Sequence, residues 1–242
     1  MSMKFWPLSS AKKFVLVSVT TFILVILCVL FLDQPIALYV YHSDPIRSFI
    51  HMLLGVIKIN SSSTDNEIPD LLMPMTLGVT LVSWIAYWLR AHRGIYDRHT
   101  YFFKMVGVTV PLAFMGKAIT KFIFGRIDTP VWVSNPRIDI SFHWFNGVDM
   151  YHGFPSGHMA VLTPLFIALW HFYPRLRLLW GTVLAGLGIA LVLTYYHFVS
   201  DVIAGAYLGL LVYCLSLKRL IPDTVSCDEA IWPKRLARKG LE

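Results

Sequence analysis

Three short clusters of polar residues interrupt a chain that is otherwise mostly apolar. The first is the turn Pro155-Ser156-Gly157-His158, which precedes a long apolar run. We expect this turn to begin a helix, and a helix N-terminus offers unpaired backbone N–H groups and a positive dipole end, which suit an anion such as phosphate. The small residues Ser156 and Gly157 let a ligand approach the backbone closely, and His158 can move a proton near neutral pH.

The second cluster is cationic and contains Lys117, Lys121 and Arg126. Lys117 and Lys121 are four residues apart, so a helix would place them on one face. Lysines at the end of a membrane helix can also extend their charges to the interface without a catalytic role. Three cations within ten residues, in a segment otherwise poor in Lys and Arg, favour an anion site.

The third cluster is Tyr195–Asp201, which contains His197 and Asp201. These two residues are four apart, and in a helix they could form a hydrogen bond on one face. A carboxylate on one ring nitrogen fixes the tautomer of the imidazole and leaves the other nitrogen as a nucleophile or base. An ionisable pair beside an apolar segment is costly, which indicates a function.

Together the three clusters contain the groups that phosphoryl transfer requires. One histidine attacks, the other protonates the leaving group, and cations with backbone N–H groups hold the phosphate oxygens. The elements that position these groups must lie in a bilayer. The chain of 242 residues is 56% hydrophobic and only 14% charged, where a soluble domain has about 25% charged residues.

Six apolar segments are long enough to be membrane spans, which need roughly 20 residues each. We therefore predict an all-α, polytopic membrane protein that forms a single domain over residues 1–242. The segment from Ile46 to Ile59 could form a short helix on the membrane surface. The predicted spans are 14–32, 71–89, 101–119, 158–173, 178–196 and 200–217.

Most of the 21 lysines and arginines fall in alternate connecting segments, including both ends of the chain. Positive residues concentrate on the cytoplasmic side, so this pattern predicts cytoplasmic N- and C-termini. The three polar clusters then lie together at the outer face. The net charge of +7 is explained by these orientation signals, and we expect no nucleic-acid partner.

The motifs resemble those of the type 2 phosphatidic acid phosphatase superfamily, a family of integral-membrane lipid phosphatases with six spans. The second family motif is present intact as Pro155-Ser156-Gly157-His158. The third retains His197 and Asp201, followed by Val202-Ile203-Ala204-Gly205. The first retains Lys121 and Phe124-Gly125-Arg126. Taken together, the order of the motifs, their spacing and the six predicted spans extend the resemblance over most of the chain.

The resemblance implies a phosphatase that needs no metal and no cofactor. His197 would be the phosphorylated nucleophile, oriented by Asp201, and His158 would be the general acid. Lys121, Ser156 and Gly157 would hold the phosphate of a membrane lipid in the bilayer. The implied substrates are phosphatidic acid, phosphatidylglycerol phosphate, undecaprenyl diphosphate and a lipid A phosphate, acted on at the periplasmic face of a bacterial inner membrane.

Two arginines of the family pattern are absent, because Asp128 and Leu191 occupy their positions. A charge-assisted contact contributes roughly 1.5–3 kcal/mol, so losing two weakens phosphate binding unless other cations replace them. Arg126, Arg137 and Lys117 are the candidates, and we include Arg126 in the phosphate-binding set. Asp128 could instead pair with one of these cations.

Other functions remain open at this stage. The lost arginines are compatible with a lipid-binding pseudo-phosphatase, and the same phosphohistidine could transfer phosphate between lipids. A metal-dependent hydrolase could use His152, His158, His197 and Asp201, although no His-Glu-x-x-His motif is present. A transporter would need charges within its spans. Aromatic residues between the first and second motifs could form an interface belt or line the substrate site. The sequence does not fix the oligomeric state.

Overall fold

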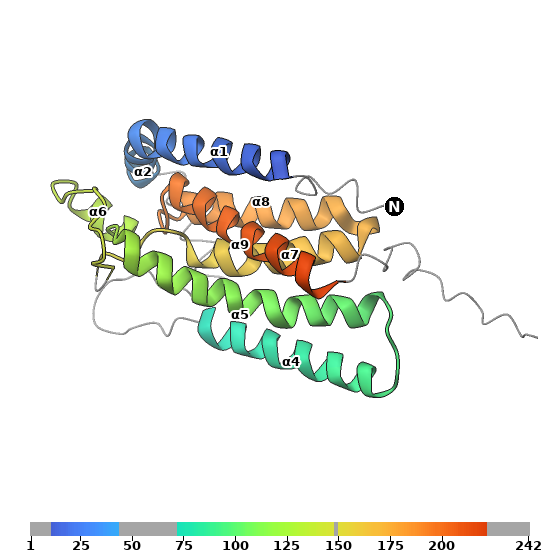
Figure 1. Cartoon of the computed structure of the whole chain (residues 1–242). Coiled ribbons are helices and arrows are strands. Elements are labelled where there is room, and N and C mark those ends of the chain that lie inside the picture. The colour runs from blue at the N-terminus through green and yellow to red at the C-terminus, as the bar shows by residue number, and fades with distance from the viewer. Residues whose placement is uncertain (1–10, 44–71, 148–149, 222–242) are drawn as a thin grey trace, which may run out of the picture.

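The computed structural model describes residues 11–43, 72–147 and 150–221. Within these ranges, long helices lie side by side in one bundle and no strand is present (Figure 1). The helices are α1 (Ala11–Leu27), η2 (Cys28–Leu32), α2 (Asp33–His42), α4 (Leu72–His92), α5 (Arg98–Phe124), α6 (Thr129–Ser134), α7 (Gly157–Phe172), η3 (Pro174–Leu176), α8 (Arg177–Leu193) and α9 (Val199–Leu220).

Five helical segments of the described chain are long and apolar enough to cross a membrane. They are Ala11–His42, Leu72–His92, Arg98–Phe124, Pro174–Leu193 and Val199–Leu220. The prediction of an all-α, polytopic membrane protein is therefore confirmed. The predicted span 158–173 corresponds to α7, which has only 16 residues. Six spans, one domain and the assignment of faces remain predictions, and Ile46–Ile59 lies outside the described residues.

Helix α5 extends further at its C-terminal end than the predicted span 101–119. It begins after Asp97, whose side chain accepts a hydrogen bond from the Thr100 amide at 3.0 Å. It ends at Gly125, which has a φ of 41° and is therefore in the left-handed region that favours glycine. The lysines that suggested a span boundary lie inside this helix.

Helices α4 and α5 form an antiparallel pair (Figure 1). The indole Nε1 of Trp84 donates to the Gly107 carbonyl at 3.0 Å, which the absence of a side chain at Gly107 permits. At the end of the pair, Arg90 Nη2 lies 2.6 Å from Asp97 Oδ2. These contacts join the two helices at their middle and at one end.

Helix α7 packs between α5 and α9 in the centre of the bundle. Two glycines of α9, Gly205 and Gly209, allow the close approach of α7. A Cβ on Gly205 would lie 2.4 Å from the Ser156 carbonyl oxygen, and one on Gly209 would lie 2.6 Å from that of Ala160. Small residues four apart at a helix contact are typical of membrane helix pairs. This contact fixes the start of α7 against the start of α9.

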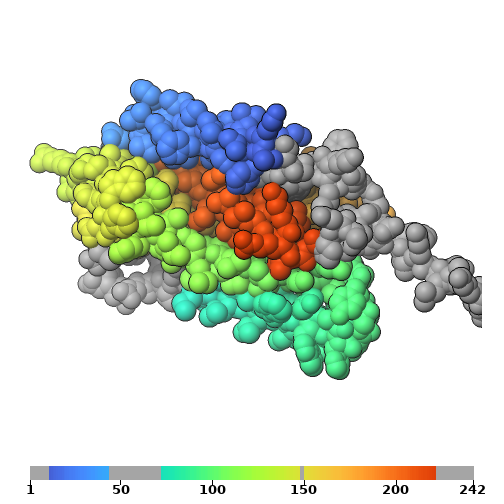
Figure 2. Space-filling model, viewed as in Figure 1, coloured from blue at the N-terminus to red at the C-terminus, as the bar shows by residue number. Residues whose placement is uncertain are grey.

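One end of the bundle is covered by α6 and the segment that follows it. In Figure 1 the C-terminal end of α5, the N-terminal ends of α7 and α9, and helix α2 all meet at this end. Figure 2 shows α6 and its neighbouring loop as a compact cap beside α2. The three polar clusters of the sequence therefore lie at the same end of the molecule.

Candidate functional site

The two histidines of the predicted site face each other across a short gap. His158 is in the first turn of α7, and His197 is in the turn between α8 and α9. Their ring centroids are 6.4 Å apart, and Tyr196 lies 5.5 Å from the first ring and 5.2 Å from the second. His197 is buried and His158 is half-buried. The structure thus brings together two residues that are 39 positions apart in the sequence.

The expected helical hydrogen bond between His197 and Asp201 is not formed. Helix α9 begins at Val199, after His197, and the distance from His197 Nδ1 to Asp201 Oδ2 is 3.8 Å. Asp201 Oδ2 accepts instead from the Phe198 amide at 3.1 Å and so caps the helix. His197 Nδ1 still faces the carboxylate, at ion-pair distance rather than within a hydrogen bond.

Helix α7 begins at Gly157, directly after Ser156, as the turn sequence predicted. Ser156 Oγ accepts from the Met159 amide at 3.4 Å, and the Ser156 amide donates to the Asp201 carbonyl at 2.9 Å. Ser156 is fully buried. Its side chain therefore caps α7. The helix start is tied directly to α9.

Lys117 lies against this helix start. A Cβ on Gly157 would be 3.0 Å from Lys117 Cδ, so the glycine makes room for the lysine stem. The ammonium of Lys117 lies 4.4 Å from the centroid of the Phe114 ring. Lys121, one turn further along α5, is half-buried. The cationic face of α5 thus extends to the N-terminus of α7.

Arg126 is fully buried and forms ion pairs with two carboxylates. Its Nη1 donates to Asp201 Oδ1 at 2.8 Å, and its Nη2 donates to Asp33 Oδ2 at 2.8 Å. The guanidinium also lies 4.4 Å from the Phe198 ring centroid and 5.4 Å from that of Phe142. A guanidinium with no exposed surface and both terminal nitrogens paired does not suit the phosphate-binding role predicted for it. Its burial and its two carboxylate partners indicate that Arg126 has a structural role instead.

Asp128 and Leu191 occupy the two positions of the missing arginines. Asp128 Oδ2 lies 3.5 Å from His152 Nδ1, a histidine that was not among the cations expected to pair with it. Burial raises the pKa of Asp128, and the charges of His152, Lys121 and His197 oppose that rise. Leu191 is buried, and its carbonyl accepts from the amides of Tyr196 and His197 at 3.0 and 3.2 Å.

The segment between the first and second motifs wraps around the end of α5. The amide of His143 donates to the Gly125 carbonyl at 2.8 Å, and that of Gly153 donates to the Arg126 carbonyl at 2.8 Å. Its aromatic residues divide between two environments. Phe142 and Phe154 pack on Phe124 with centroids 6.0 and 5.2 Å away, whereas the side chains of Trp144 and Phe145 are exposed.

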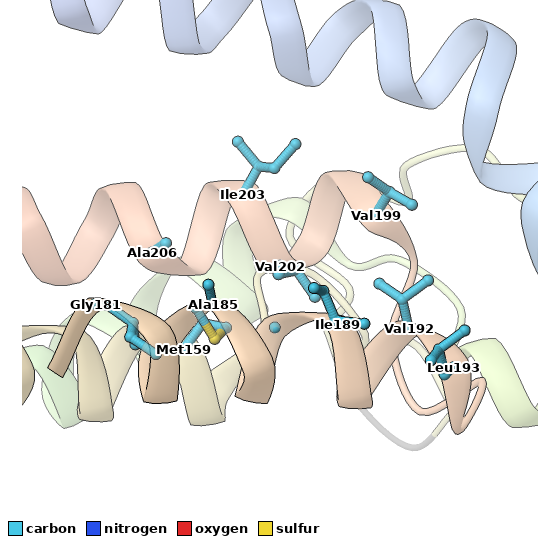
Figure 3. A pocket seen from close by; sticks show the side chains of 12 residues that line it. Met159, Gly181, Ala185, Ile189, Val192, Leu193, Val199, Val202, Ile203 and Ala206 are labelled. Atoms are coloured by element: carbon cyan, nitrogen blue, oxygen red, sulfur yellow. The ribbon is translucent and has the colours of Figure 1, made fainter. Parts of the chain in front are cut away.

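An apolar groove lies between α8 and α9 (Figure 3). Its volume is about 540 Å³. Met159, which follows His158 in the chain, and Val202, which follows Asp201, both line it. On α8 the small residues Gly181 and Ala185 leave the groove open. All of its lining residues are apolar or glycine, so the groove suits a hydrocarbon chain.

Asp33 is the site residue that sequence reasoning missed. It lies more than ninety positions before Arg126 in sequence, but its carboxylate is buried beside Arg126 and Ser200. The available signal was a carboxylate adjoining an apolar run that is itself long enough to be a span. Among the described residues, no group of three or more His, Cys, Asp or Glu converges as metal ligands would.

Parts of the chain are similar to known proteins. Residues 102–221 match the family model described as the PAP2 superfamily. The chain is 32% identical over 102 residues to a lipid A 1-phosphatase of Rhizobium etli, covering 38% of this chain and 44% of the relative. It is 33% identical over 109 residues to a lipid A 1-phosphatase of Rhizobium johnstonii, covering 40% and 42% respectively.

The matched region thus spans less than half the length of these curated relatives. No solved structure matches the chain. The matched residues contain most of α5 and all of α6 through α9, and with them all three polar clusters, whereas α1, α2 and α4 precede the match. By this match and by the site it contains, the chain belongs to the PAP2 superfamily.

Proposed function

We propose that the protein is a lipid phosphatase that hydrolyses a phosphomonoester or pyrophosphate on a membrane lipid through a phosphohistidine. The observation that carries this proposal is the pairing of His158 with His197, at a 6.4 Å centroid distance, beside the N-terminus of α7. A nucleophile and an acid on opposite sides of an anion-binding helix end are what in-line phosphoryl transfer needs. Lys117 and Lys121 on α5 supply positive charge.

The reaction follows from the orientation of the two rings. Because His197 Nδ1 faces Asp201, Nε2 attacks phosphorus, and the bond from phosphorus to the leaving oxygen breaks. His158 gives its proton to that oxygen. A water molecule then attacks the phosphohistidine, His158 takes one proton from it, and inorganic phosphate leaves with His197 restored. Lys121, Lys117 and the backbone N–H groups of Gly157 and His158 hold the phosphate oxygens.

The groove between α8 and α9 supports a lipid as the substrate. Met159 and Val202, which follow His158 and Asp201 in the chain, line it, so we infer that a phosphate at the histidines would place an acyl chain against these two residues. The curated relatives are lipid A 1-phosphatases, which makes a lipid A phosphate the first substrate to test. Phosphatidic acid, phosphatidylglycerol phosphate and undecaprenyl diphosphate belong to the same chemical class.

The proposed location is a bacterial inner membrane, with both termini in the cytoplasm and the site facing the periplasm. Its support is the bacterial source of the relatives and the charge distribution of the sequence. A lipid phosphate in the outer leaflet would then reach the histidines from the bilayer, with its chain in the groove.

Two alternative functions are compatible with this fold, and the reaction products distinguish them. A phosphotransferase would pass the phosphate from His197 to a second lipid phosphate instead of water. A lipid-binding pseudo-phosphatase would do neither, and the absence of both family arginines at Asp128 and Leu191 is the observation in its favour. Lys117 beside Gly157 provides a cation that can compensate for them.

The test is phosphate release by the purified protein in detergent with EDTA present. The panel holds the four lipid phosphates and a water-soluble phosphomonoester, and lipid products are separated to detect transfer. We expect release from at least one lipid, loss of at least about a hundredfold in His197→Ala and His158→Ala, and no loss in His92→Ala, an exposed histidine at the other end of the bundle. Release that persists in His197→Ala contradicts the phosphohistidine. Complete inactivity of the folded wild-type protein supports the pseudo-phosphatase.

A further inference from the structure

Arg126 links two carboxylates in a cluster that is closed to solvent. Asp33, Arg126, Ser200 and Asp201 are each no more than 1% exposed. Besides accepting from Arg126, Asp33 accepts from the Ser200 amide at 3.0 Å and from the Ser200 hydroxyl at 2.5 Å. Arg126 Nη1 in turn donates to Ser200 Oγ at 2.7 Å. Each terminal nitrogen of the guanidinium thus has one carboxylate.

With both carboxylates ionised, the cluster would hold one guanidinium and two carboxylates. That is one net negative charge in a buried place, which is costly unless a cation is near. His197 faces the cluster, with Nδ1 at 3.8 Å from Asp201 Oδ2 and with no hydrogen-bond partner among the described residues. A proton on the other nitrogen of His197 would make its ring positive and would balance that charge.

The division of Arg126 between two carboxylates matters for His197. If Asp33 were neutral, the full charge of Arg126 would act on Asp201, because a guanidinium can bind one carboxylate with two nitrogens. Asp201 would then be a weaker partner for the positive ring that forms during phosphoryl transfer. Asp33 instead accepts the hydrogen bond of Arg126 Nη2, so Asp201 Oδ2 does not bind the guanidinium and remains directed at His197.

A π-helical turn directly precedes Asp33, and the Asp33 side chain is buried. Among the described residues of α1 none is buried, as expected for a helix that faces lipid. The five residues Cys28–Leu32 form a π-helix, in which the Asp33 amide donates to the Cys28 carbonyl. After this turn the buried positions are Asp33, Ala37 and Val40, at helical spacing. Single π-helical turns often occur at functional sites because they rotate the following residues.

We propose that Asp33 is a positioning residue for the reaction at His197, acting through Arg126 and Asp201. This inference rests on the proposed function and extends the site to a helix that precedes the region matched by the family. Close to His197 lie His158 from α7 and Asp128 between α5 and α6, and the charge of Asp128 also interacts with that of Lys121 on α5. Asp33 would act on His197 through the buried cluster.

The test replaces Asp33 with Asn, which keeps the shape and removes the charge. We expect Asp33→Asn to lower kcat by about 10- to 100-fold with little change in KM, by analogy with the loss seen when a group that orients a metal-bound imidazole is removed. The acidic limb of the pH–rate profile should move to lower pH, because a ring with less negative charge nearby holds its proton less tightly. Asp33→Glu should recover part of the rate.

Val40→Ala is the matched control, since Val40 is buried on the same face of α2 and carries no charge. It should change thermal stability but neither kcat nor the pH profile. A normal rate and profile in Asp33→Asn would overturn the inference, and so would the same kinetic change in Val40→Ala, which would show that packing of α2 is responsible.

A second measurement does not depend on turnover. In protein with isotope-labelled histidine in detergent, the ring titration of His197, assigned with His197→Gln, should have its midpoint about 0.5 pH unit or more lower in Asp33→Asn than in the wild type. If the wild-type protein hydrolyses none of the lipids, the proposed function fails, and this titration still decides the inference. An unchanged midpoint overturns the role of Asp33, and a lowered one supports it.

Discussion

Asp128 shows how a single residue would change the character of the proposed phosphate site. It replaces an arginine of the family pattern, so a group that would attract phosphate is exchanged for one that repels it. Its side chain is 28% exposed and lies beside His152. Since burial raises the pKa of Asp128, more of it is protonated in weak acid than an exposed aspartate would be.

We therefore expect the KM for a lipid phosphate to rise as the pH increases through the raised pKa of Asp128. Below that pKa the carboxyl is neutral and phosphate is not repelled. Asp128→Asn should remove this part of the pH dependence and lower the KM near pH 7 by about three- to tenfold, a modest effect because solvent screens the charge. The measurement is KM against pH for both proteins.

The stability of the folded protein should also depend on the charge of Asp128. A carboxyl whose pKa is raised by folding stabilises the protein below its unfolded pKa, about 3.9, and this contribution is lost as the pH rises through the folded value. Asp128→Asn should then be at least as stable as the wild type at pH 7. Asp139→Asn, at an exposed carboxylate in the same segment, is the control and should leave KM unchanged. A higher KM in Asp128→Asn would show that this carboxylate helps to bind the substrate.

At the scale of elements, the contact between α7 and α9 positions the chemistry. His158 lies in α7, and His197 lies just before α9. The Ser156 amide donates to the Asp201 carbonyl across the contact. Gly205 and Gly209 allow the two helices to approach this closely. Packing of small residues replaces the hydrophobic driving force that is weak within lipid.

Gly209→Ala should destabilise the protein even though alanine is the better helix former. The new Cβ would lie 2.6 Å from the Ala160 carbonyl oxygen and 2.8 Å from Thr163 Cβ, so the helices must separate. We expect a loss of about 1–3 kcal/mol, the usual range for overpacking, and a parallel loss of activity. Thermal unfolding in detergent measures the first effect.

Gly186→Ala is the matched control, because a Cβ on Gly186, also within a membrane helix, meets nothing within 4 Å. It should be neutral or stabilising by up to about 1 kcal/mol through helix propensity. Equal unfolding temperatures for the two variants would mean that α7 and α9 are not held together at Gly209.

At the scale of the whole molecule, the site lies at one end of a bundle and not in its middle. The C-terminal end of α5 and the N-terminal ends of α7 and α9 meet there under the cap formed by α6 and the loop beyond it (Figures 1 and 2). The opposite end carries the connection from α4 to α5, with Arg90 paired to Asp97. One surface of the membrane therefore has access to the histidines.

We expect a membrane-impermeant maleimide to label Asn135→Cys in intact bacterial cells and to label Arg93→Cys only after permeabilisation. Both positions are exposed, the first at the site end of the bundle and the second at the other end. The background is a variant in which Cys28, Cys214 and Cys227 are replaced. The reverse labelling pattern would place the site in the cytoplasm and contradict the orientation inferred from the lysines and arginines.

The sequence by itself determined the features that depend on local pattern. Apolar segments predicted the long helices, because a bilayer requires continuous helices that satisfy their own backbone hydrogen bonds. The turn before His158 predicted the start of α7, since Ser at the N-cap and the following apolar run act over a few residues. The motifs also placed His158, His197 and Asp201 in one candidate site.

Only the tertiary structure decided which charges meet. Arg126 was expected at the phosphate, but Asp33 from the first helical segment and Asp201 from α9 enclose it instead. His197 and Asp201 were expected on one helical turn, but α9 begins between them. Long-range ion pairing depends on how helices from distant parts of the chain pack, and the spacing of residues along one helix carries no information about it.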